Sequence, residues 1–185
     1  HGPGHLQRLL LSRGLAAIAI DESAQMGRLA KRNLQRAFPA YSNEPTKTER
    51  VVDYAQSSLA RGVAQHLPFP SDFFQTIVAT FPTEYITDPQ TLAEVQRCLT
   101  DGGKLVVLPV ALPTNRALDW LFKTTRQRPP ETLEIIRSKL KEPFIRAGFA
   151  TDVKTLDVKS GILLIVSATK RTPDPLSLSS EQTAD

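Results

Sequence analysis

The chain has 185 residues, of which 41% are hydrophobic and 23% are charged, which is enough apolar material for the core of one ordinary globular domain. The net charge of +4 and the isoelectric point near 9.4 are mild, and basic residues form no long run, so nucleic-acid binding is not indicated. The chain has one cysteine, Cys98, which excludes an internal disulfide. The sequence has no long apolar run and no signal peptide, which predicts a cytoplasmic protein without a membrane span.

The first segment of the chain is a glycine turn that leads directly into a helix. Gly2 and Gly4 flank Pro3, and glycines let backbone N–H groups approach a ligand closely. After the helix, residues 15–20 (LAAIAI) are continuously apolar and predict a parallel strand that is buried on both faces. Asp21 is the first charge after this strand. An acid about 20 residues beyond a glycine turn can bind the ribose hydroxyls of a nucleotide.

Other interpretations of these residues stay open. The two glycines can form a plain turn, and Asp21 can cap the helix that begins near Ser23, in which case Glu22 is the ribose ligand.

The start of the chain, His1, lies inside the glycine turn, and no strand precedes it. In a βαβ unit the turn follows a strand, so we expect the first, central strand of the sheet to be missing. A structure should then show one of two arrangements. Either the sheet has a gap at its centre, or residues 16–20 pair directly with residues 77–81.

The rest of the chain alternates between helical and strand patterns. Helical patterns cover residues 23–37, 88–99 and 131–148, and apolar or β-branched runs predict strands at residues 57–63, 75–81, 104–110, 149–158 and 161–169. The last two strands are expected to form an antiparallel hairpin around a tight turn. This alternation predicts an α/β fold with a doubly wound, mostly parallel sheet and a C-terminal antiparallel hairpin.

Three stretches fall outside the alternation. Residues 39–50 read as a polar loop, residues 112–130 as an insertion, and residues 172–185 as a disordered tail rich in proline and serine. Residues 1–171 are therefore expected to form the domain.

Four short motifs occur in a characteristic order: HGPG at residues 1–4, IDESAQM at 20–26, LPFP at 67–70, and LTDGGKL at 99–105. Together they resemble class I S-adenosylmethionine-dependent methyltransferases of the small-molecule, type 11-like kind, over nearly the whole chain. The resemblance implies a Rossmann-like fold, S-adenosylmethionine as cofactor and methyl transfer to a small-molecule acceptor. The cofactor-binding residues that it implies are Gly2, Pro3, Gly4, Asp21, Glu22, Ala64, Gln65 and Thr80.

The chain departs from the family pattern at the adenine end of this site. Val63 stands where the family usually has an acid that contacts the adenine amino group. The contact must then come from the backbone, from Gln65, or be absent. Asp101 replaces the usual proline before Gly102 and Gly103, which make the turn themselves.

The resemblance also indicates the acceptor side of the site. Glu84 and Tyr85 follow the strand at residues 75–81 and would face the transferred methyl group as candidate catalytic residues, although a solvated loop pair fits equally. Trp120 and Phe122 are either core residues or, with Tyr85, the walls of an apolar acceptor pocket. No metal-ligand spacing and no Ser/His/Asp set occurs. Nothing in the sequence indicates an oligomeric state.

Two other functions also fit these residues. A nicotinamide-dinucleotide-binding oxidoreductase would use a similar turn and acid, but the third glycine of its G-x-G-x-x-G motif is missing here. A non-catalytic methyltransferase remnant is the other. Binding of S-adenosylmethionine distinguishes these possibilities.

Overall fold

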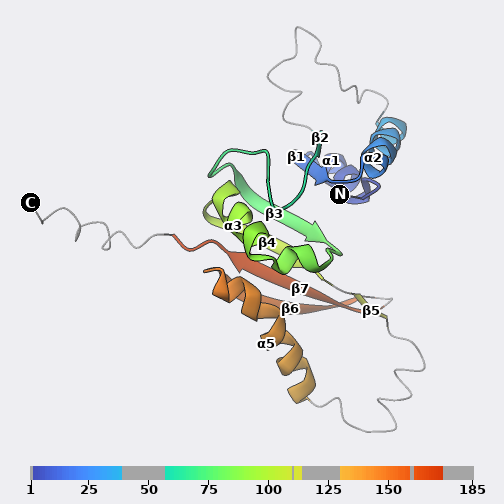
Figure 1. The fold of residues 1–185 in the computed structure, drawn as a ribbon. Coiled ribbons are helices and arrows are strands. Elements are labelled where there is room, and N and C mark those ends of the chain that lie inside the picture. Colours follow the sequence, from blue (N-terminus) through green and yellow to red (C-terminus); the bar gives the residue numbers. More distant parts are fainter. Residues whose placement is uncertain (1, 39–56, 110, 114–129, 159–160, 173–185) are drawn as a thin grey trace, which may run out of the picture. The chain divides into compact units, whose positions relative to one another are not determined.

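The computed structural model describes residues 2–38, 57–109, 111–113, 130–158 and 161–172. The chain divides into two compact units, His1–His66 and Leu67–Asp185. In Figure 1 the first unit runs from blue to teal, and the second from green to red.

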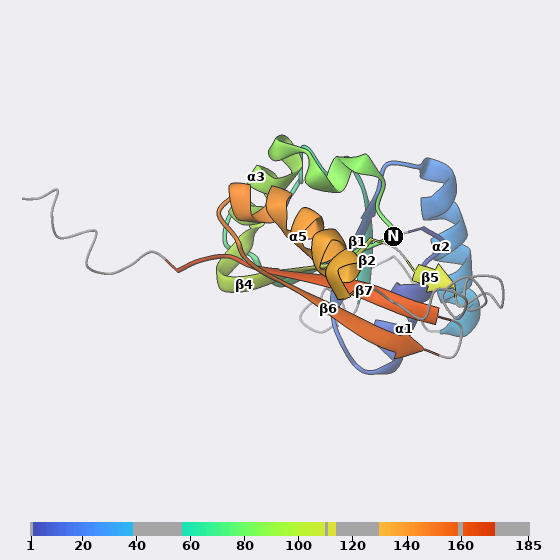
Figure 2. The ribbon, with the colours of Figure 1, turned by 90° about the horizontal axis from the view of Figure 1, so that it is seen from below.

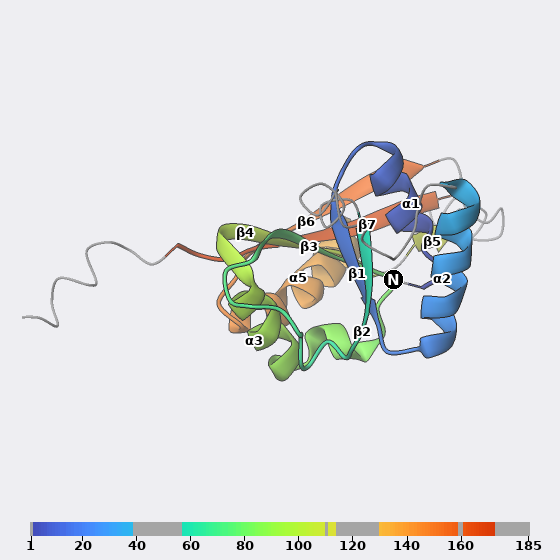
Figure 3. The same cartoon turned by 90° about the horizontal axis from the view of Figure 1, so that it is seen from above.

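The first unit contains two helices and a parallel pair of strands. Its elements are α1 (His5–Ser12), β1 (Ala17–Asp21), α2 (Ala24–Ala37) and β2 (Ser57–Arg61). The strands pair from Ala17 opposite Ser57 to Asp21 opposite Arg61. Figure 3 shows β1 and β2 side by side, with α2 running along them. Because the strands are parallel, their carboxyl ends meet at Asp21 and Arg61.

Local sequence explains the boundaries of these helices. α1 ends where Gly14 takes a left-handed conformation with φ of 70°, and the Leu15 amide donates to the Leu10 carbonyl at 3.0 Å. α2 begins after Ser23, whose hydroxyl accepts a hydrogen bond from the Met26 amide at 3.3 Å. Ser23 is therefore the N-cap of α2, which removes the interpretation of Asp21 as the cap.

The expectation that β1 is buried on both faces is wrong. The strand covers Ala17–Asp21, and within it only Ala19 is buried, while Leu15 before it is 52% exposed. The apolar run is less covered because, among the described strands, β1 has β2 as its single neighbour.

The second unit contains a five-stranded sheet and the remaining helices. Its elements are β3 (Phe74–Thr80), the short 3₁₀ helix η2 (Glu84–Thr87), α3 (Pro89–Cys98), β4 (Leu99–Leu108), β5 (Ala111–Pro113), α5 (Pro130–Arg146), β6 (Ala150–Val158) and β7 (Gly161–Thr169). β3 and β4 are parallel, and β7 is antiparallel to β4, β5 and β6. The α/β class and the closing hairpin are therefore confirmed.

The core of the second unit lies between its sheet and its helices. Figure 2 shows α3 and α5 on the same face of β4, β7 and β6. The largest fully buried side chains of this unit come from both layers and include Leu92, Leu99, Leu105, Phe149 and Leu164. Cys98 is buried as well, as expected for a small core residue.

Two boundaries in this unit differ from the prediction. The strand predicted at residues 104–110 begins five residues earlier, at Leu99, because Leu99 already pairs with Phe74 before the register shifts. It ends at Leu108, directly before Pro109, which has no amide to donate. The predicted insertion opens with the short strand β5, which pairs with β7.

The strand pairing also bears on the expected gap in the sheet. Among the described strands, β1 pairs with β2 and β3 pairs with β4, in two separate sheets. Direct pairing of residues 16–20 with residues 77–81 is not among the strand pairs of the described residues.

Residues 39–50, Trp120, Phe122 and the tail from residue 173 lie outside the described residues. Of the helices that are described, none has the length and apolar character needed to span a bilayer.

Candidate functional site

The carboxylate of Asp21 joins the glycine turn to the end of β1. Its Oδ2 accepts a hydrogen bond from the Gly2 amide at 2.9 Å, across 19 residues of sequence. Its Oδ1 accepts one from the Ser23 amide, also at 2.9 Å. One side chain thus fixes both the turn and the start of α2.

Asp21 is ionised over the physiological range. Partial burial raises its pKa, but the hydrogen bonds from the Ser23 and Gly2 amides favour the charged form and bring the pKa below its ordinary value of 3.8. The site therefore presents a fixed negative charge beside the glycine turn.

The strand end that carries Asp21 is held by β2 as well. The Gly62 amide donates to the Asp21 carbonyl at 3.2 Å, and Arg61 Nε donates to the Glu22 carbonyl at 3.0 Å. Glu22 itself is exposed. Of the two candidate acids, Asp21 is the one whose carboxylate contacts the turn.

The glycine turn packs closely against α2. A Cβ atom on Gly4 would lie 3.1 Å from Ala30 Cβ and 3.2 Å from Ala30 Cα, and Gly4 has φ of +82°. Asn33 Nδ2 also donates to the Pro3 carbonyl at 3.0 Å. The turn therefore requires glycine at position 4 for both space and conformation.

We expect Gly4→Ala to lower the free energy of unfolding by about 2 kcal/mol, from left-handed strain plus crowding against Ala30. Chemical denaturation measures this. Gly2→Ala is the matched control, because φ is +54° there but nothing lies within 4 Å of the added Cβ, so only the strain remains. Equal losses in the two variants would contradict the packing argument.

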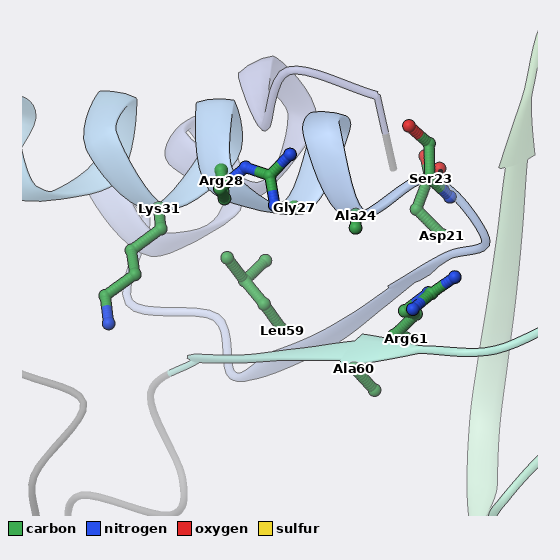
Figure 4. A pocket seen from close by; sticks show the side chains of 9 residues that line it. All are labelled: Asp21, Ser23, Ala24, Gly27, Arg28, Lys31, Leu59, Ala60 and Arg61. Carbon is green, nitrogen blue, oxygen red and sulfur yellow. Dashed lines mark hydrogen bonds between the residues drawn. The ribbon is translucent and has the colours of Figure 1, made fainter.

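A shallow cavity of about 250 Å³ lies beside Asp21, between α2 and β2. Figure 4 shows the residues that line it: Asp21, Ser23, Ala24, Gly27, Arg28, Lys31, Leu59, Ala60 and Arg61. Three of them are cations that sequence reasoning did not single out. The helical pattern of the sequence does place Arg28 and Lys31 one turn apart on α2. Basic residues at this spacing, however, indicate only the solvated face of a helix.

Ala64 and Gln65 form the centre of a turn that follows β2. The His66 amide donates to the Val63 carbonyl at 3.2 Å and closes the turn. Both central residues are half-buried, whereas Val63 is 37% exposed. The turn contains no acidic side chain, and its polar groups are its backbone groups, the Gln65 amide and the His66 imidazole.

The remaining candidates belong to the second unit and follow one another at the end of β3. Thr80 is the exposed last residue of β3, and Phe81 beyond it takes φ of 49° and is 61% exposed. Glu84 and Tyr85 then open η2 and are exposed, while Ile86 is buried and anchors η2 to the core. The structure therefore joins Gly2–Gly4 with Asp21 in one unit, and Thr80 with Glu84 and Tyr85 in the other.

Comparison with known protein families gives a match over more than half of the chain. The family described as "Methyltransferase domain" matches residues 1–107. This stretch runs from the glycine turn to the middle of β4 and includes Asp21.

Curated relatives match shorter stretches. The ubiquinone/menaquinone biosynthesis C-methyltransferase of Teredinibacter turnerae is 39% identical over 69 residues, which cover 37% of this chain and 26% of that protein. The protein of the same name from Hahella chejuensis is 43% identical over 53 residues, covering 28% of this chain and 21% of that protein. The matched stretch thus spans about a quarter of the length of these relatives.

Solved structures show a similar fold over most of the chain. A SAM-dependent methyltransferase from Methanosarcina mazei is 19% identical, with a TM-score of 0.60 and coverage of 92% of this chain and 89% of that chain. Magnesium protoporphyrin IX methyltransferase from Synechocystis, solved with bound SAH, is 17% identical, with a TM-score of 0.53 and coverage of 92% and 71%. At these identities the likeness concerns the fold.

Proposed function

Since this chain belongs to the methyltransferase domain family, in its S-adenosylmethionine-dependent class I, we propose that it transfers the cofactor's methyl group to a small-molecule acceptor. The observation that carries this proposal is the hydrogen bond from the Gly2 amide to the Asp21 carboxylate. It makes the glycine turn and the acid one site, at the carboxyl end of a parallel strand, where open α/β sheets bind nucleotides.

The donor and acceptor groups at this site fit the cofactor's ribose. The Asp21 carboxylate is ionised, and an ionised carboxylate accepts hydrogen bonds from hydroxyl groups of the kind that a ribose carries. We assign the ribose to Asp21, with Glu22 as its neighbour, and the amino-acid part of the cofactor to Gly2, Pro3 and Gly4. We assign the adenine base of the cofactor to Ala64 and Gln65. We propose Thr80 as a further residue that contacts the cofactor.

Methyl transfer depends mainly on how the protein positions the acceptor atom relative to the methyl group. The cofactor supplies an electrophilic methyl carbon on a sulfonium, which an acceptor atom attacks in line when held about 3–3.5 Å away in a dry pocket. A general base is needed where the acceptor loses a proton. Glu84 and Tyr85, exposed at the end of β3, are our candidates for that role.

For the acceptor we propose a quinol-type aromatic ring. The support is the name of the relatives, which are C-methyltransferases of ubiquinone and menaquinone biosynthesis. Carbon methylation of such a ring forms a bond from the ring carbon to the methyl carbon, breaks the methyl–sulfur bond, and releases the ring proton to a base. An apolar ring also suits the aromatic residues Tyr85, Trp120 and Phe122 as pocket walls.

The experiment is a calorimetric titration with S-adenosylhomocysteine, followed by transfer of a labelled methyl group from S-adenosylmethionine to a short-chain demethylated quinol. We expect saturable binding and label in the quinol. A titration with NADH is the control, and binding of NADH alone would support the nicotinamide alternative. Binding without transfer to any acceptor would favour the non-catalytic alternative, and binding of neither compound would contradict the proposal.

In the same assay, Trp120→Ala tests the acceptor pocket. We expect acceptor turnover to fall while affinity for S-adenosylhomocysteine changes less than about twofold, because the proposed pocket wall contacts only the acceptor. If Trp120 is instead a core residue, its loss should lower the free energy of unfolding by about 3–5 kcal/mol. A thermal melt beside the kinetic measurement distinguishes the two outcomes.

A further inference from the structure

Glu94 and Arg97 form a bidentate ion pair one turn apart on α3. Arg97 Nε lies 2.8 Å from Glu94 Oε1, and Arg97 Nη2 donates to Glu94 Oε2 at 2.9 Å. Planar guanidinium and carboxylate groups that pair in this way fix each other's orientation. The two side chains therefore act as one rigid group on the surface of α3.

This pair holds the irregular segment that carries the LPFP motif. The Leu67 amide donates to Glu94 Oε2 at 2.9 Å, and Arg97 Nη2 donates to the Leu67 carbonyl at 3.0 Å. Arg97 Nη1 donates to the Phe69 carbonyl at 2.8 Å. Both backbone polar groups of Leu67 are thus bound by the pair, in a segment whose prolines have no amides to offer.

The arrangement differs from an ordinary surface ion pair. Such a pair between exposed side chains contributes about 0–1 kcal/mol to stability. Here the Arg97 and Glu94 side chains are 35% and 20% exposed, and both also form hydrogen bonds to the backbone of the LPFP segment. What the pair determines is the path of the chain at Leu67.

We propose that Glu94 and Arg97 are positioning residues for adenine recognition, an inference that rests on the proposed function. Leu67 is the first residue after the Val63–His66 turn, to which the proposed function assigns the base of the cofactor. Because residue 63 is a valine and not an acid, the groups that this turn offers to the base are its backbone groups and the side chains of Gln65 and His66, and the path of the backbone sets where all of them lie. Fixing Leu67 restricts that path at the point where the chain leaves the turn.

The chemistry of the base provides a readout that a purely structural role would not change. Adenine has an acceptor at N1 and a donor at its amino group, whereas hypoxanthine has a donor at N1 and an acceptor at the adjacent oxygen. A backbone amide has a fixed polarity, so a turn held in one conformation distinguishes the two bases. If the backbone after residue 66 is less constrained, the turn takes more conformations and distinguishes the two bases less.

The test is Arg97→Lys in the full chain, because one ammonium group cannot reproduce the planar fork that binds Glu94, Leu67 and Phe69 together. Titrations with S-adenosylhomocysteine and S-inosylhomocysteine give the preference for adenine. We expect this preference to fall by about five- to tenfold. Arg137→Lys is the matched control, since Arg137 pairs with Glu134 at 2.7 Å with the same spacing on α5, where we expect no change.

Amide hydrogen exchange at residues 63–67 is measured on the same proteins. Faster exchange there in Arg97→Lys, together with the loss of preference, supports the proposal. A lower melting temperature with an unchanged preference overturns it. If the wild-type chain binds neither compound, the proposed function fails, and unchanged exchange at residues 63–67 would then show that the positioning claim fails as well.

Discussion

Asp21→Ala should weaken the binding of S-adenosylhomocysteine by about 10- to 150-fold, which corresponds to about 1.5–3 kcal/mol. Two losses contribute to this effect. The ribose hydroxyls lose the charged acceptor that we propose for them, and the glycine turn loses the hydrogen bond from the Gly2 amide to the carboxylate. Calorimetric titration of both proteins under one set of conditions gives the difference directly.

Glu22→Ala is the control for this prediction, because Glu22 is the next acid in the chain and is exposed. The affinity of the Glu22→Ala variant for S-adenosylhomocysteine should stay within about twofold of the wild-type value. Unchanged affinity in Asp21→Ala with a loss in Glu22→Ala would move the ribose contact by one residue. A small loss of stability is expected in Asp21→Ala, since the Gly2 and Ser23 amides both lose their acceptor.

The pH dependence follows from the direction of the pKa shift. The pKa of Asp21 is lower in the folded chain than its ordinary value of 3.8, so its hydrogen bonds stabilise the fold fully above about pH 5. That contribution is lost as the pH falls through 3.8 and below. In the Asp21→Asn variant, the free energy of unfolding should therefore fall less between about pH 5 and pH 3 than it does in the wild type.

Gly103→Ala is expected to lower the free energy of unfolding by about 2–4 kcal/mol, which is the largest effect on stability that we predict for a single added methyl group. A Cβ on Gly103 would lie 2.7 Å from the Thr100 carbonyl oxygen and 3.2 Å from that of Phe74. Both are backbone atoms in the region where β3 and β4 shift register, so no side-chain rotation can relieve the contact. Denaturant unfolding measures the loss.

Gly102→Ala provides the comparison at the neighbouring position. Gly102 has φ of +71°, but nothing lies within 4 Å of an added Cβ, so its substitution should cost only about 1–2 kcal/mol of conformational strain. Similar losses in the two variants would show that the β4 backbone moves to accommodate the methyl group. The two glycines of the motif thus serve different purposes, one for conformation and one for space.

The sequence alone predicted most of the helices and strands and singled out the acid that contacts the glycine turn. Glycine turns and apolar periodicity are local signals, and they predicted the helices near residues 23–37 and 88–99 and the closing hairpin. The order of the motifs also led to the methyltransferase family and to Asp21, whose carboxylate the structure places against the Gly2 amide.

Tertiary structure decided what depends on neighbours distant in sequence. The burial of β1 is set by how many strands flank it, which an apolar run does not encode, and the early start of β4 depends on the pairing of Leu99 with Phe74. Gly4 packs closely against Ala30, and Arg97 donates a hydrogen bond to the Leu67 carbonyl. Both contacts join residues that are about 26–30 positions apart in the sequence. A local pattern limits each residue's conformation, but the identity of its packing partner is fixed only once the segments have met.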